Sequence, residues 1–325
     1  MTTRVLRALK APLSAAAALL FLGLRGQLLA QPAPLPDLEA ELAALRVPPA
    51  WLTEVHSTYD VTKPWKEARL QVRQLLDQQA NREAVALTYD YVVVRKATPD
   101  DHEYALYLYL GGEYAWATKV YRERLAASPA REGIDYANLA SLYLHFGKPQ
   151  DAVATLEQGL EHLPKAPWDV PNQAKLNERL GDVRARLGDK EQARRHYEEA
   201  AALYPTSKQP WGRETLPKHV LRLEGKSALL QRGHGRLDKL AEGTTKGSAI
   251  GYAGEVAVEL EVRQGRVADL RLSHREHIDQ GASRRLPAEI LRRQSLEVDA
   301  ITAATVTRDA IVEATYRAAR QAGLK

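Results

Sequence analysis

The chain has 325 residues, which is enough for two ordinary domains that each bury their own core. It contains no cysteine, which excludes disulfides, cysteine-ligated metals and clusters, thiol catalysis and any lipid anchor on a cysteine. The formal charge of +5 falls to about +1 without the four basic side chains of residues 1–30, which excludes the general electrostatic case for binding nucleic acid.

Residues 1–30 predict an export signal or an N-terminal anchor. A basic start precedes an uncharged run from Ala11 to Leu24, and small and polar residues follow around Ala30. The run is 14 residues long, whereas a helix needs about 20 residues to cross a bilayer, so we expect cleavage near Ala30 rather than an uncleaved anchor. Both alternatives predict an exported protein, in the periplasm or on the extracytoplasmic face of the membrane.

Residues 31–63 predict a lead-in segment. They are rich in proline around a short amphipathic patch from Leu38 to Leu45, which indicates either an ordered lead-in or a spacer. Between Trp65 and Val94 the apolar side chains recur at helical spacing, which predicts two helices.

A repeat follows, and it is visible in the spacing of glycine, alanine and proline. Gly112, Gly147 and Gly188 are 35 and 41 residues apart, and each lies 17 residues before a proline. An alanine follows each glycine at the same offset, at positions Ala117, Ala152 and Ala193. The pattern predicts a helix, a turn at glycine, a second helix and a stop at proline, with small residues where the two helices approach each other.

These spacings resemble the tetratricopeptide repeat family across residues 101–205, and the copy that ends at Pro205 fits best. The resemblance implies a stack of helix pairs that docks a protein partner, and we assign residues 64–205 to it. A six-residue excess before the third copy falls on residues 165–171, which predicts an insertion. The tyrosines from 104 to 121 are expected to fill helix interfaces or, in the alternative, to line a peptide groove.

Residues 206–238 predict a linker, because proline, glycine and basic residues replace the helical pattern there. The period then changes to two, and apolar side chains alternate from Val256 to Val262, which predicts a strand. Gln264-Gly265 predicts a hairpin turn into a second strand. A helix from Pro287 to Gln294 and a last helix from about Thr307 to Ala322 follow.

The predicted fold is therefore multidomain. An all-α, tetratricopeptide-like stack precedes a small α+β domain, which we assign to residues 239–325.

The α+β domain carries a second resemblance. Its motifs are Gly251-Tyr252-x-Gly254, Ser273-His274-x-Glu276, Gln294-Ser295 and Asp299-Ala300-Ile301-Thr302-x-Ala304-Thr305-x-Thr307. They resemble the FMN-binding domain family found in the peripheral flavin subunits of the Rnf complex and of the sodium-pumping NADH:quinone oxidoreductase. The resemblance implies FMN as the cofactor, attached through its phosphate to a threonine by a flavin transferase.

Carried over to this sequence, the resemblance implies Thr305 as the attachment residue, with Thr307 as the alternative. The other cofactor-binding residues that the motifs imply are Thr302, Ala304, Asp299, His274, Glu276, Tyr252 and Gly254. The physical chemistry of the turn agrees, because a helix start directs free backbone N–H groups and a positive dipole end at a phosphate.

The turn also departs from the family pattern. Ala303 stands where the family has glycine, and His277-Ile278-Asp279 replaces the usual Thr-Gly after Glu276. A helix N-cap remains the alternative role for Thr305 or Thr307.

Together these features predict an extracytoplasmic flavoprotein that carries FMN for electron transfer. The repeats are expected to dock a redox protein or a membrane electron-transfer complex, and a flavin transferase is expected for maturation. No metal-ligand spacing or nucleophile motif occurs, so we assign no catalytic residue and no metal ligand. The alternatives are an interaction scaffold whose FMN-binding-like domain has lost its flavin, and a subunit that supplies one flavin to a larger oxidoreductase.

Overall fold

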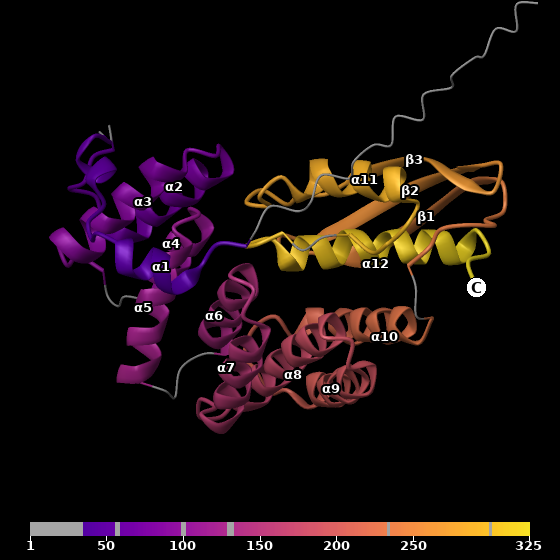
Figure 1. Cartoon of the computed structure of the whole chain (residues 1–325), viewed down its shortest axis with the longest axis horizontal. Coiled ribbons are helices and arrows are strands. Elements are labelled where there is room, and N and C mark those ends of the chain that lie inside the picture. The colour runs from indigo at the N-terminus through magenta and orange to yellow at the C-terminus, as the bar shows by residue number, and fades with distance from the viewer. Residues whose placement is uncertain (1–34, 56–58, 99–101, 129–132, 233–234, 299–300) are drawn as a thin grey trace, which may run out of the picture. The chain divides into compact units, whose positions relative to one another are not determined.

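The computed structural model describes residues 35–55, 59–98, 102–128, 133–232, 235–298 and 301–325 (Figure 1). The predicted export signal or anchor and the predicted site residue Asp299 lie outside these ranges. Leu35–Lys325 form one unit by their contacts. Across the described part of the chain, every helix is too short or too polar to span a bilayer.

The lead-in is ordered and packs on the repeats. Helix α1 (Leu38–Ala44) begins at Asp37, whose carboxylate accepts the backbone N–H groups of Glu39 and Ala40. Leu38 is fully buried, and Glu39 forms an ion pair with Arg122 at 3.3 Å. The two helices predicted next are α2 (Trp65–Asp77) and α3 (Asn81–Tyr89), and α3 continues into a single π-helical turn at Asp90–Val94.

Three helix pairs follow, as the repeat spacing predicted. The pairs are α4 (His102–Leu110) with α5 (Tyr114–Ala127), α6 (Gly133–His145) with α7 (Pro149–Glu161), and α8 (Asp169–Arg186) with α9 (Lys190–Leu203). The predicted turn glycines have φ of 87°, 67° and 81°, which is the left-handed region that favours glycine. The alanines five residues later are fully buried, so the two helices of each pair approach closely.

Four of the five tyrosines of α4 and α5 are buried at helix interfaces, as the first of the two alternatives predicts, while Tyr114 is half-buried. Tyr107 packs beside Trp65 against α2 and α3, with its ring centroid 6.2 Å from that of Trp65. Tyr109 belongs to the larger core of the repeats. The insertion is split between a turn and an early start of α8, which at 18 residues is longer than α4 or α6.

The segment predicted as a linker, residues 206–238, has regular secondary structure. Most of this segment is helix α10 (Leu216–Arg232), preceded by short 3₁₀ turns at Tyr204–Thr206 and Arg213–Thr215. Its single proline, Pro217, lies in the first turn, where a missing N–H costs nothing, and Leu216 and Leu223 are buried against α9. The high content of basic residues in this segment made its amphipathic helical pattern difficult to recognise, because apolar positions are interspersed with basic ones.

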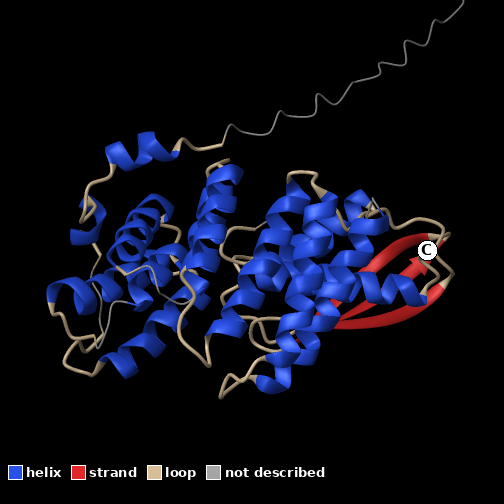
Figure 2. Cartoon of the chain, turned by 90° about the horizontal axis from the view of Figure 1, so that it is seen from below, coloured by secondary structure: helices blue, strands red, loops and turns tan. Residues whose placement is uncertain are grey.

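The C-terminal domain is a three-stranded antiparallel sheet with two helices, and the strands are the red arrows in Figure 2. The strands β1 (Gly243–Ile250), β2 (Glu255–Arg263) and β3 (Arg266–Ser273) are neighbours in that order. The alternating apolar residues of β2 are buried, and Gln264 and Gly265 form the predicted hairpin turn with φ of 53° and 72°. Helix α11 is Ala282–Arg293 and α12 is Thr305–Gln321, so both begin earlier than predicted. The predicted fold class is confirmed.

The sequence did not predict β1, because this strand carries glycines and hydroxyls instead of alternating apolar residues. Its Gly247 explains the composition. A Cβ at this position would lie 2.2 Å from the backbone oxygen of Ala314 and 2.6 Å from the backbone nitrogen of Ala318. Glycine therefore lets α12 lie directly on the sheet.

Candidate functional site

The predicted attachment turn ends at the start of α12. Ala303 has φ of 65°, and Ala304 donates its backbone N–H to the carbonyl of Ile301 at 3.0 Å. Ala304 is the N-cap residue and has no side-chain acceptor to offer, so the first turn of α12 has no side-chain cap. The free N–H groups and the positive end of the helix dipole are thus available to an anion.

The two candidate threonines differ in their surroundings. They are two positions apart on one helix and therefore point about 200° apart around its axis. Thr307 is buried and donates its hydroxyl to Oε2 of Glu276. Thr305 is half-buried, and its hydroxyl has no hydrogen-bond partner in the described ranges. Thr305 is the threonine whose hydroxyl is available for attachment.

Glu276 joins the first motif of the domain to α12. Its Oε1 accepts the backbone N–H of Ala253 at 2.7 Å, while its Oε2 accepts from Thr307. A Cβ on Gly251 would lie 2.6 Å from the same Oε1, so glycine is needed for this approach. The residues between β1 and β2 are thereby fixed beside the start of α12.

The remaining motif residues lie at the edge of this arrangement. His274 is half-buried, and its Nδ1 faces the backbone N–H of Glu276 at 3.2 Å. Gly254 closes the β1–β2 turn by accepting the N–H of Gly251 at 2.6 Å. Tyr252, in contrast, is 81% exposed, so its ring is available to a ligand or a partner.

Side chains of the repeats contact the attachment turn. The backbone N–H of Ala303 donates to the hydroxyl of Tyr109 at 2.8 Å, and Nδ1 of His145 lies 3.0 Å from Oγ1 of Thr302. Burial raises the pKa of Tyr109 to about 12, so it is a neutral phenol at pH 7. Burial lowers the pKa of His145, which favours the neutral imidazole. The repeats thus hold the turn through neutral hydrogen bonds.

Thr305 and Thr302 line a cavity of about 840 Å³. Helices α6, α8 and α10 supply one part of its lining, and the turn and α12 supply the other. Its lining includes the basic side chains of Arg179, Arg186, Lys190, Lys226, Arg293 and Arg308. Nε of Arg308 is buried without a hydrogen-bond partner among the described residues, and Arg308 is three positions from Thr305, on the same face of α12. A free hydroxyl, a free guanidinium N–H and a roomy cavity fit a phosphate ester of FMN.

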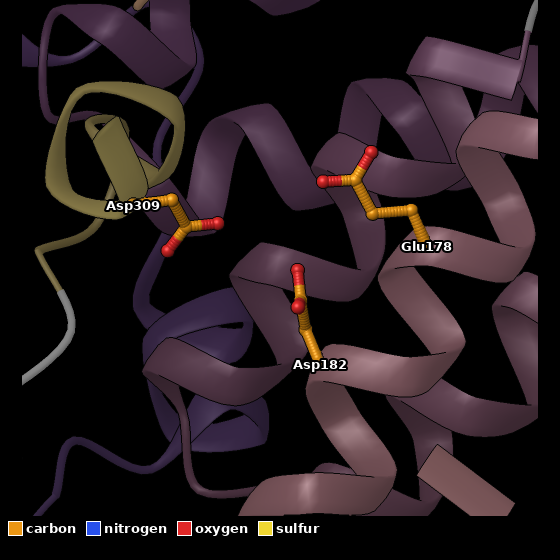
Figure 3. Close-up of side chains that lie close together, drawn as sticks. All are labelled: Glu178, Asp182 and Asp309. Carbon is orange, nitrogen blue, oxygen red and sulfur yellow. The ribbon is translucent and has the colours of Figure 1, made fainter. Parts of the chain in front are cut away.

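A buried charge network lies beside the cavity and joins α8, α10 and α12. Figure 3 shows the carboxylates of Glu178, Asp182 and Asp309, whose oxygens lie within 4.8 Å of one another. Nζ of Lys226 lies 3.1, 2.7 and 2.8 Å from them. A cluster of this kind resembles a cation site, but here the ammonium group of Lys226 supplies the positive charge.

Opposite charges determine the protonation states in this network. Burial alone would lower the pKa of Lys226, but the carboxylates outweigh burial and raise it above its usual value. Burial alone would raise the pKa of Asp309, but Lys226, Arg308 and Arg179 lower it to about 2. The lysine and this carboxylate are therefore both charged at pH 7.

The structure brings together most residues of the predicted site. Thr302, Ala304, Thr305, Thr307 and Glu276 lie at or beside the start of α12, with His274 next to them. The sequence did not predict Tyr109, His145 or Arg308, because the first two belong to the repeats and the third lies outside every motif. The repeat pattern gave no signal that its side chains reach residues more than 150 positions away.

Comparisons with known proteins agree with both parts of this arrangement. Residues 251–320 match the FMN-binding domain family, and residues 174–207 match the tetratricopeptide repeat family. The chain is also 28% identical over 95 residues to "Photosystem I assembly protein Ycf3" from Synechococcus sp. (strain CC9902), and equally to that from strain WH7803. These matches cover 29% of the chain and 55% of each relative, so the chain spans about half the length of the curated relatives it matches. The chain thus carries a tetratricopeptide repeat, which supports protein–protein interaction, and a C-terminal FMN-binding domain, whose cofactor is FMN.

Proposed function

We propose that this protein is an extracytoplasmic flavoprotein that carries FMN, linked through a phosphoester to Thr305, for electron transfer. The repeats bind the redox protein or membrane electron-transfer complex with which the flavin exchanges electrons. The observation that carries the proposal is the half-buried Thr305, whose hydroxyl is unpartnered among the described residues and lies at an uncapped helix start that lines a large cavity.

The attachment requires an activated flavin nucleotide and a transferase. The hydroxyl oxygen of Thr305 attacks the FMN phosphorus of FAD, the pyrophosphate P–O bond breaks and AMP leaves. The hydroxyl proton passes to a base of the transferase, so no electrons are exchanged in this step. The reaction joins one FMN to the chain and releases one AMP.

Several groups of the chain stabilise the ester once it forms. The free N–H groups of the first turn of α12 and the guanidinium of Arg308, on the same helix face, would hold its phosphate. Glu276 holds Thr307 away from the phosphate, so that only one of the two hydroxyls competes for attachment. When bound, FMN supplies reversible one- and two-electron transfer, and the protein contributes position and electrostatics.

The composition of residues 1–30 supports the proposed location. Their basic residues and uncharged run are typical of an export signal or anchor. Outside the cytoplasm free FMN is scarce, and a noncovalent site would lose its ligand by mass action. A phosphoester keeps the cofactor in place, which is the physical reason for covalent attachment in such a compartment.

The second candidate function is an interaction scaffold without flavin. It is favoured by Ala303, which occupies with φ of 65° the position where the family has glycine. The curated relatives are named as assembly proteins, and a scaffold of helical repeats would suit an assembly role.

The test is to co-express the chain with a flavin transferase, unfold the product and measure its mass. We expect a mass increase of one FMN that stays with the polypeptide, and yellow colour. Thr305→Ala should abolish the increase, while Thr305→Ser and Thr307→Ala should retain it. Colourless protein with unmodified mass would instead favour the scaffold, and loss of the adduct in Thr307→Ala alone would move the attachment to that residue.

A further inference from the structure

We propose that the tetratricopeptide-like helices form one wall of the flavin pocket, so that the FMN ring lies between the repeats and the C-terminal domain. This inference rests on the proposed attachment at Thr305. It gives the repeats a role in cofactor binding in addition to their role in docking a partner.

The cavity is large enough to hold a small-molecule cofactor. Its volume of about 840 Å³ falls in the range of about 300–1,000 Å³ that is usual for small-molecule sites. Thr305 lies in its wall, so an FMN attached there enters the cavity directly. Both α6 and α10 line it, and these helices lie outside the segment that matches the FMN-binding domain family.

Part of the cavity lining is apolar and comes from the repeats and α10. The repeats and α10 contribute the apolar side chains of Leu144, Val183 and Leu229. Leu144 and Leu229 are only half-buried in the described structure, although each packs against a hydrophobic core. Apolar surface of this kind inside a cavity is what a flat aromatic ring covers.

Basic side chains of the cavity lining indicate where the phosphate binds. On α12, Nε of Arg308 is unpartnered within the described ranges and can take a phosphate oxygen. Arg179 and Lys226 also line the cavity, but both are paired with the carboxylates of Asp182 and Asp309. The other basic residues of the lining, Arg186, Lys190 and Arg293, are exposed to solvent. A phosphate on Thr305 therefore has Arg308 beside it on the same face of α12, and the ring extends from there toward the apolar side chains of the repeats and α10.

Hydrogen bonds from the repeats fix the orientation of the attachment turn. Tyr109 and His145 hydrogen-bond the two residues before Ala304, which holds the turn against the repeats. A flavin attached two residues later is thus attached where the repeats already lie close. The ring does not need the two parts of the chain to separate in order to reach the wall that the repeats provide.

The test introduces a tryptophan into the proposed wall, because an indole in contact with a flavin quenches its fluorescence by electron transfer. No tryptophan is among the residues that line the cavity in the described structure. Leu144→Trp places one there from α6, and Leu229→Trp places one from α10, in case the first variant fails to fold. Leu160→Trp on α7 is the matched control, since Leu160 is also half-buried against the same core as Leu144 but does not line the cavity.

Each variant is matured with the transferase, and two quantities are measured. The mass of the unfolded protein reports attachment, and the flavin fluorescence per attached FMN, native against unfolded, reports contact. We expect full attachment in all variants and at least threefold lower native fluorescence in Leu144→Trp or Leu229→Trp than in Leu160→Trp. The visible circular dichroism of the flavin should change in the same variants, which gives a second signal where native fluorescence is already weak.

The outcomes separate the two proposals. Absence of the mass increase in the unmodified chain would overturn the proposed function. A complete mass increase with the same fluorescence and circular dichroism in wall and control variants would leave that function standing and overturn the placement of the ring against the repeats.

Discussion

Ala303 donates its backbone N–H to the hydroxyl of Tyr109 at 2.8 Å, although the two residues are 194 positions apart in the chain. The donor belongs to the attachment turn, and the acceptor belongs to the first of the three repeat pairs. Because Ala303 has φ of 65°, this hydrogen bond helps to hold an alanine in a conformation that glycine adopts more readily.

The first prediction concerns this conformation. Ala303→Gly should stabilise the protein by about 0.5–1 kcal/mol, because relief of the left-handed strain exceeds the added entropy of the unfolded chain. Ala304→Gly is the control: Ala304 has φ of −131° and is 4% exposed, so its replacement should cost about 1 kcal/mol. Urea unfolding measures the free energy of unfolding of both variants. If Ala304→Gly stabilised the protein and Ala303→Gly did not, the backbone strain assigned to Ala303 would be contradicted.

The second prediction concerns Lys226, whose ammonium group lies among three carboxylates. Lys226→Met should destabilise the protein by about 3–5 kcal/mol, because it leaves buried negative charges without their partner. Lys218→Met changes an exposed lysine of the same helix and should cost less than about 0.5 kcal/mol. Equal unfolding free energies for the two variants would show that the network contributes nothing to stability.

The third prediction concerns the contact between β1 and α12. Gly247→Ala should cost about 3 kcal/mol or more, since the new Cβ would meet the backbone of α12 at 2.2 Å and neither side can yield. Ser248→Ala, at the neighbouring half-buried position of the same strand, should cost about 0.5 kcal/mol or less. Thermal melting compares them, and a melting temperature for Gly247→Ala that equals that of Ser248→Ala would refute the close approach.

The fourth prediction concerns pH. Burial, and then the nearby Arg222, lower the pKa of His219 to about 4 from 6.5, while Glu178 opposes and Lys175 adds to the shift. Between pH 6.5 and about 4 the unfolded chain therefore binds more protons at this site than the folded one, so stability falls as the pH falls. The loss reaches about 3 kcal/mol for a shift of this size.

His219→Phe keeps a ring to stack on Tyr204, whose centroid is 4.9 Å away, and removes the titration. The stability of this variant relative to the unmodified chain should rise by about 3 kcal/mol between pH 7 and pH 4. Denaturant unfolding at a series of pH values measures this difference. A difference that stays constant across the series would place the acid sensitivity elsewhere.

The sequence predicted the elements whose signal is local. The repeat pairs follow from glycine, alanine and proline at fixed offsets, and β2 follows from strict alternation of apolar residues. Strand β1 was not predicted, because a strand that must admit a helix at close range uses glycine in place of apolar side chains. Helix α10 was not predicted within the segment assigned as a linker, because its buried positions are few and its surface is basic.

In the candidate site, too, the sequence predicted what local motifs encode and missed what depends on tertiary contacts. The family motif placed Thr305, Thr307 and Glu276 in one region, but only the structure distinguishes the bonded hydroxyl of Thr307 from the available one of Thr305. The contributions of Tyr109 and His145 depend on tertiary contacts across more than 150 residues. No periodicity or motif in the sequence encodes such a contact.

The position of Lys226 also determines how the molecule can be divided. A fragment that starts at residue 239 would contain the whole family match, yet it would lack α10 and α8 and with them every basic partner of Asp309 except Arg308. Its α12 would then present to water a surface that in the intact chain is covered by α10. Truncation experiments on the C-terminal domain should therefore keep both of these helices.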